Sequence, residues 1–95
     1  MSKHEVKQKI LREGEFRRGE KFGPEVVNKG AILMDCEWDG GLFESGIMVG
    51  GIFRKGTFRG GTIYGTVWLG GEWIDGRWES GFDQTGRYRP RTDHP

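Results

Sequence analysis

From Trp38 to Tyr88 a large apolar side chain recurs at every fifth residue, and this period constrains the fold more than any other feature of the chain. We call these residues the repeat positions. They are Trp38, Phe43, Met48, Phe53, Phe58, Ile63, Trp68, Trp73, Trp78, Asp83 and Tyr88, and only Asp83 is not apolar. A glycine stands three residues after each one up to Asp83, with Thr66 as the exception. Glycine at fixed spacing is unlike a flexible low-complexity tract, so the pattern predicts an ordered repeat structure.

The glycine pairs predict how the repeats are joined. Dipeptides such as Lys55-Gly56 and Gly60-Gly61 are typical of two-residue hairpin turns, because glycine adopts positive φ without steric cost. A turn at each pair would connect three-residue strands into an antiparallel β-meander, with Phe53 opposite Phe58. We therefore expect an all-β fold.

Three regions follow from this interpretation. Residues 37–88 would form the repeat sheet, preceded in residues 1–36 by degenerate repeats and followed by a disordered tail from residue 89 to 95. Ser2 and Glu5 match a capping box, which allows a short N-terminal helix. Simple alternation between Ala31 and Asp39 would place Ile32, Met34, Cys36 and Trp38 on the same side as the repeat positions.

The five-residue period also resembles that of the pentapeptide-repeat proteins. In that family each unit forms one side of a square, right-handed β-helix with the central side chain inside. Here Trp68, Trp73 and Trp78 would have to share one narrow interior, and the glycines would have no evident purpose at the corners. The meander is therefore preferred, with the β-helix as the alternative.

A second resemblance bears on function. The segment Gly71-Glu72-Trp73-Ile74-Asp75-Gly76 contains the G-x-W-x-x-G core of the membrane occupation and recognition nexus (MORN) repeat. The chain is also similar to short W-x-x-G-x-W arrays in small phage and bacterial proteins, although its period is much shorter than that of a MORN repeat. The resemblance implies a scaffold or interaction role without catalytic chemistry, and a phage accessory or host-modulating protein as the context.

The two faces of a meander would differ in composition. One face would carry the expected structural core, Trp38, Phe43, Phe53, Phe58, Trp68, Trp73 and Trp78. So large an apolar row needs a cover, which residues 1–36, a second copy or another protein could supply. The other face would carry a central apolar group with charged ends, as protein interfaces do. Its residues are Ile47, Val49, Ile52, Tyr64, Val67 and Leu69, and we expect homo-oligomerisation or docking on another protein through them.

Catalytic chemistry is not expected. The histidines, His4 and His94, stand in the terminal segments, and Cys36 is expected to be a buried apolar residue. We therefore expect no enzyme activity, cofactor, metal site or small-molecule substrate. The lone cysteine suits a reducing compartment, and no apolar run could span a bilayer, so the sequence predicts a cytoplasmic protein without a membrane partner.

Nucleic-acid binding is the alternative function. Arg54, Lys55 and Arg59 alternate with aromatic residues that could stack on bases. The net charge of only +1 disfavours this alternative, because tracking phosphates requires a basic surface.

Overall fold

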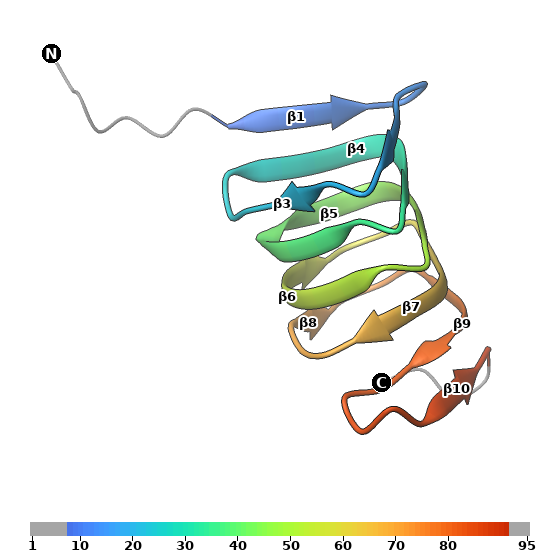
Figure 1. Ribbon diagram of the computed structural model, residues 1–95. Helices are drawn as coiled ribbons and strands as arrows, with labels where there is room; N and C mark the ends of the chain where they lie inside the picture. The colour runs from blue at the N-terminus through green and yellow to red at the C-terminus, as the bar shows by residue number, and fades with distance from the viewer. Residues whose placement is uncertain (1–7, 92–95) are drawn as a thin grey trace, which may run out of the picture.

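The computed structural model describes residues 8–91, and these residues form strands and turns without any helix (Figure 1). The strands are β1 (Lys9–Arg12), β2 (Phe16–Arg18), β3 (Lys21–Phe22), β4 (Val26–Met34), β5 (Glu37–Val49), β6 (Ile52–Phe58), β7 (Thr62–Trp68), β8 (Glu72–Trp73), β9 (Arg77–Phe82) and β10 (Tyr88–Pro90). They belong to one hydrogen-bonded sheet that winds into successive turns. The expected all-β class is confirmed.

Successive turns of this coil are parallel and in register. Trp38 pairs with Phe53, and Phe53 pairs with Trp68, so one turn takes 15 residues, or three five-residue units. The molecule is therefore a β-solenoid with three sides. The β-helix alternative is right in giving each unit one side, but the cross-section is a triangle instead of a square. The antiparallel meander, with Phe53 opposite Phe58, is wrong: within residues 8–91 only β9 and β10 pair antiparallel.

The repeat side chains from Trp38 to Trp78 point inward and stack in three columns, one for each side, whereas Tyr88 is 55 % exposed. The columns are Phe22, Trp38, Phe53 and Trp68; Leu11, Asn28, Phe43, Phe58 and Trp73; and Arg17, Leu33, Met48, Ile63 and Trp78. Within a column the rings from Trp38 onward are nearly parallel, as for Phe53 and Trp68, whose centroids lie 4.2 Å apart at an interplanar angle of 4°. Around one turn they meet edge to face, which is the other favoured geometry of aromatic pairs.

This geometry removes both arguments that favoured the meander. Trp68, Trp73 and Trp78 fit inside one turn because their rings meet edge to face, with centroids 5.7–6.3 Å apart. The glycines also have a purpose. A Cβ at Gly56 would lie 2.5 Å from the carbonyl oxygen of Gly41 in the turn before, which is closer than real contacts allow. The glycines thus allow adjacent turns to approach at the corners.

The aromatic row needs no external cover. The side chains of the core column residues shield one another, and Trp38, Phe43, Phe53 and Phe58 have no exposed surface. Trp68 and Trp78 are also buried, and Trp73 is partly buried against them. The expectation of a cover followed from a flat sheet, whereas a closed coil has an inside.

The described strands extend beyond the expected repeat region on both sides. Strands β1 to β4 pair with one another or with β5 in parallel, so residues 9–34 add turns to the same coil. At the other end Arg89 and Pro90, where a tail was expected to begin, belong to β10. The proposed helix around Ser2 and Glu5, and residues 92–95 of the tail, lie outside the described residues.

Candidate interaction surface

The six residues expected at an interface lie on two different sides of the solenoid. Ile47, Val49 and Tyr64 flank the buried column of Met48 and Ile63, with Val49 and Tyr64 paired across strands. Ile52 and Val67 pair on the next side, outside Phe53 and Trp68. Leu69 follows Trp68 and borders a cavity at the C-terminal end.

The first of these sides carries a longer apolar surface than the sequence analysis predicted. In one row Phe16 pairs with Ile32 and Ile32 with Ile47; in the parallel row Met34 pairs with Val49 and Val49 with Tyr64. We call these six residues the apolar strip. Phe16 is 54 % exposed, Ile47 38 % and Tyr64 56 %, whereas the other three are half-buried. Beyond the strip, the first row continues from Ile47 to Thr62 and Arg77, and the second from Tyr64 to Ser80.

Ile32 and Met34 were missed because alternation fails at a corner. Asp35 adopts a φ of 54°, which turns the chain there and shifts its phase. Ile32 and Met34 therefore lie outside the coil, while Leu33 and Cys36 are buried. The inward Leu33 precedes Trp38 by five residues, so extending the five-residue period backwards would have placed the neighbours of Leu33 outside.

The basic residues proposed for nucleic acid lie away from this strip and close to carboxylates. Nε of Arg54 donates to Oε2 of Glu37 at 2.7 Å, and this bond raises the pKa of the Arg54 guanidinium. Nζ of Lys55 lies 3.9 Å from Oδ1 of Asp39. Arg59 is exposed. Phe53 and Phe58 have no exposed surface, so their rings are not available for stacking on bases.

Cys36 is buried, and its thiol lies 3.4 Å from the carbonyl oxygen of Met34. Burial raises the pKa of this thiol, which favours its protonated, unreactive form. Across residues 8–91 there is also no cluster of three or more histidine, cysteine, aspartate or glutamate side chains that could hold a metal ion.

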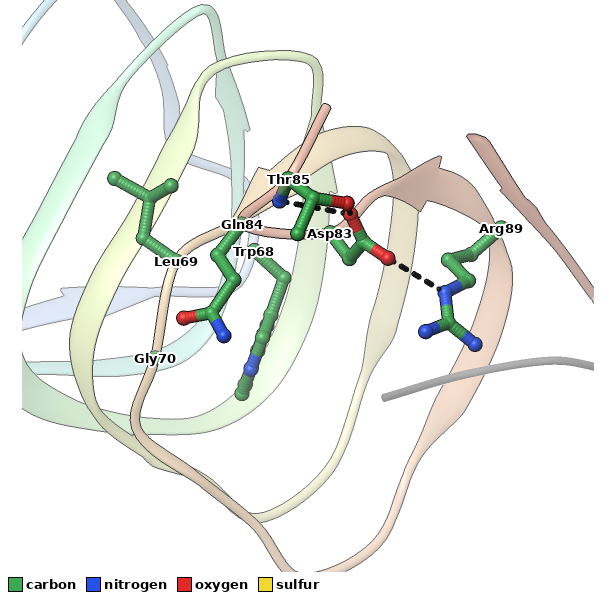
Figure 2. Close-up of a pocket in the computed structure, with 7 residues that line it drawn as sticks. All are labelled: Trp68, Leu69, Gly70, Asp83, Gln84, Thr85 and Arg89. Atoms are coloured by element: carbon green, nitrogen blue, oxygen red, sulfur yellow. Dashed lines mark hydrogen bonds and ion pairs between the residues drawn. The ribbon is translucent and has the colours of Figure 1, made fainter. Parts of the chain in front are cut away.

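A cavity of about 320 Å³ lies at the C-terminal end of the coil (Figure 2). Trp68, Leu69 and Gly70 line it from the last full turn, and Asp83, Gln84, Thr85 and Arg89 from the segment after β9. The Asp83 carboxylate accepts hydrogen bonds from the Thr85 hydroxyl at 2.6 Å and from Nε of Arg89 at 2.9 Å. These bonds link residues of the segment after β9 to one another, and the bond from Nε1 of Trp78 to the carbonyl oxygen of Arg89 joins that segment to the coil.

These hydrogen bonds, that of Thr85 above all, hold the pKa of Asp83 well below its usual range. A carboxylate with a depressed pKa in the folded state stabilises the fold above its unfolded pKa, near 4. This stabilisation is lost as the pH falls from about 4 toward the pKa of the folded state, because over that range the unfolded chain binds the proton more tightly than the folded protein. Asp83 therefore acts as an ionised anchor for Thr85 and Arg89 at neutral pH.

Comparison with protein-family models, with curated proteins and with solved structures finds no significant match. The MORN-like and pentapeptide-repeat resemblances therefore remain expectations from the sequence. Among the described residues no helix has the length and apolar character needed to cross a membrane.

Proposed function

We propose that this protein is a non-enzymatic assembly module that pairs side by side with a second copy through the apolar strip. The observation that carries the proposal is the exposure of Phe16, Ile47 and Tyr64 in neighbouring rows of one side, although the core buries its own aromatic residues. Water contact with such a surface is unfavourable, and a second strip would remove it. A cytoplasmic phage or bacterial accessory protein remains the proposed context.

An antiparallel arrangement of the two solenoids suits the strip best. The second row runs Arg18, Met34, Val49, Tyr64, Ser80. Reversing one copy about Val49 would lay Met34 on Tyr64 of the other copy, a favourable sulfur–aromatic contact. It would also bring Arg18 level with Ser80 and the adjacent Glu79, whereas a parallel arrangement would bring the two Arg18 side chains together.

The size of the strip indicates a weak dimer. Six side chains over three or four turns, at about 4.8 Å per turn, cover less than the roughly 800 Å² per partner of a standard interface. We therefore expect a dissociation constant in the micromolar range, about −8 kcal/mol.

Light scattering after size exclusion, from about 1 µM to 1 mM protein, tests the proposal. The mass of the wild-type protein should rise from 10.8 kDa toward twice that value. Ile47→Asp should hold it at the monomer value, because dimerisation would bury the new carboxylate. Ile74→Asp is the matched control, since Ile74 is 53 % exposed on a different side and should behave as wild type. A wild-type monomer at every concentration, or an equal effect of both substitutions, would contradict the proposal.

The antiparallel arrangement has its own test, in a Cys36→Ala background. Met34→Cys and Tyr64→Cys proteins are prepared separately, mixed and treated with a short thiol cross-linker. The mixture should give more cross-linked dimer than either protein alone. More dimer from each protein alone would favour a parallel pair instead.

The alternative, nucleic-acid binding through Arg54, Lys55 and Arg59, has less support. Two of these cations lie beside carboxylates, and the neighbouring phenylalanines are buried. Single-stranded DNA binding that weakens steeply with added salt and with Arg59→Ala would favour this alternative over the proposed module.

A further inference from the structure

The two ends of the solenoid differ from its middle in what occupies the core columns. At the N-terminal end the column of Leu33, Met48 and Ile63 begins with Arg17, which pairs with Leu33. At the C-terminal end Phe82 pairs with Val67, so Asp83 follows Trp68 in its column. A charged residue thus stands at one terminal core position at each end of the coil.

Each terminal charge has at least one partner of opposite charge. Nη1 of Arg17 donates to Oε1 of Glu20 at 3.2 Å, and Nη2 donates to Oε1 of Glu15 at 3.1 Å. The Arg17 side chain keeps 32 % of its surface exposed, so this cluster faces water over the first turn. At the other end Asp83 is bonded to Thr85 and Arg89, and Arg89 accepts a hydrogen bond at its carbonyl oxygen from Nε1 of Trp78.

The strand edges at both ends are also unsuited to further pairing. In β1, β2 and β3, the first strands of the coil, five of the nine residues are lysine or arginine. Lysine and arginine on an edge strand discourage the addition of another strand. At the C-terminal end β10 pairs antiparallel with β9 and contains Pro90, so it does not continue the parallel ladder.

A solenoid without such ends would add copies of itself. The turns have the same three sides and the same 15-residue register, so a last turn released from β10 would match the first turn of another copy. That head-to-tail contact does not close on itself and would produce fibres. Burying the ion pairs of Arg17, or that of Asp83 with Arg89, in the joint would remove water from their exposed cations, which is unfavourable.

We propose that the ion clusters of Arg17 with Glu15 and Glu20, and of Asp83 with Thr85 and Arg89, close the two ends against stacking on a second copy. The ends are therefore a latent pair of complementary interfaces. This inference does not depend on the apolar strip, since the ends and the side are different surfaces.

The test replaces the terminal charges with residues that their columns already contain, Arg17→Leu and Asp83→Phe. Asp83→Phe also removes the hydrogen bonds from Thr85, Arg87 and Arg89 that hold β10 and the residues before it, so that β10 can leave the β9 edge. All proteins also carry Ile47→Asp, so that side-by-side pairing is suppressed. The double variant should form assemblies that lengthen with concentration, seen by light scattering and as filaments of uniform width by electron microscopy. Each single variant leaves one charged cluster in every joint and should stay at the parent mass.

An equimolar mixture of the two single variants provides the sharpest control. Only the N-terminal end of the Arg17→Leu protein and the C-terminal end of the Asp83→Phe protein are then apolar, so assembly should stop at a pair.

A second control changes charges away from the ends. Glu44→Leu with Arg59→Leu removes one charge of each sign from exposed positions outside the columns, and should cause no assembly.

A folded double variant, judged by circular dichroism, that keeps the parent mass up to about 1 mM would overturn the proposal. If that variant does not fold, Arg17→Met with Asp83→Thr replaces it, since this coil already buries Met48 and Thr66. The same outcomes apply to it. Irregular aggregates that form equally in the Glu44 and Arg59 control would also count against end-to-end stacking.

Discussion

Gly56 shows at the scale of one residue why this sequence requires glycine at the corners. The residue has a φ of 124°, and the carbonyl oxygen of Gly41 occupies the space where a side chain would begin. Thr66, the one exception in the glycine series, is preceded by Gly65 with a φ of 71°. Its hydroxyl donates to the carbonyl oxygen of Gly50 at 2.8 Å. Thr66 thus forms a hydrogen bond with the previous turn at the position where the other repeats have glycine.

Gly56→Ala should be much more damaging than Gly14→Ala. Both glycines have positive φ, but nothing lies within 4 Å of a Cβ at Gly14. Backbone strain alone costs about 1–3 kcal/mol, and overpacking adds about as much. We expect Gly56→Ala to lower the free energy of unfolding by about 4 kcal/mol and Gly14→Ala by about 1 kcal/mol, measured by urea denaturation. Equal losses would show that the close approach at the corner is unimportant.

At the scale of the element, a strand in this protein is stabilised by the rings above and below it. Strand β6 contributes Phe53 and Phe58, which stack on Trp68 and Trp73 of the following turn at 4.2 and 4.5 Å between centroids. Short strands would be weak alone, because few backbone hydrogen bonds join them. The columns of rings, which continue from turn to turn, supply the missing stabilisation.

Phe53→Ala should therefore destabilise the protein far more than Phe16→Ala. Phe53 is fully buried between Trp38 and Trp68, whereas Phe16 is 54 % exposed on the apolar strip. Truncating a buried phenylalanine costs about 3–5 kcal/mol, and exposed substitutions usually cost less than about 0.5 kcal/mol. Thermal unfolding of both variants at low protein concentration would measure the difference. Similar melting temperatures would mean that the columns do not form the core.

For the whole molecule, the solenoid and the antiparallel meander differ in which residues lie next to each other on neighbouring strands. Thr57 pairs with Glu72 in the solenoid, and Arg54 and Thr57 lie within the single strand β6. In the meander, by contrast, Arg54 would face Thr57 across a turn, with Glu72 three strands away, or about 14 Å.

Cysteine pairs distinguish these arrangements in solution. In a Cys36→Ala background, Thr57→Cys with Glu72→Cys should form a disulfide on mild oxidation, because neighbouring strands bring the Cα atoms within the required range. Arg54→Cys with Thr57→Cys should remain reduced. Thiol titration and mass spectrometry would score both pairs, and the opposite result would restore the meander.

The all-β class could be predicted from the amino-acid sequence, since a five-residue period with regular glycine fits no helix. The amino-acid sequence also indicates which large side chains gather together, because Trp38, Phe43, Phe53 and Phe58 share one phase of the period. Both conclusions rest on local spacing, which is the same whichever strands pair.

Which repeats pair with one another could not be predicted from the amino-acid sequence and is shown by the tertiary structure. A glycine at a corner and a glycine in a hairpin turn both have positive φ, so Lys55-Gly56 is compatible with either arrangement. The choice depends on contacts 15 residues apart, such as that of Phe53 with Trp68. The extent of the apolar strip and the charged ends followed from the same choice, because closing the coil puts the repeat positions from Trp38 to Asp83 inside and leaves the flanking residues outside.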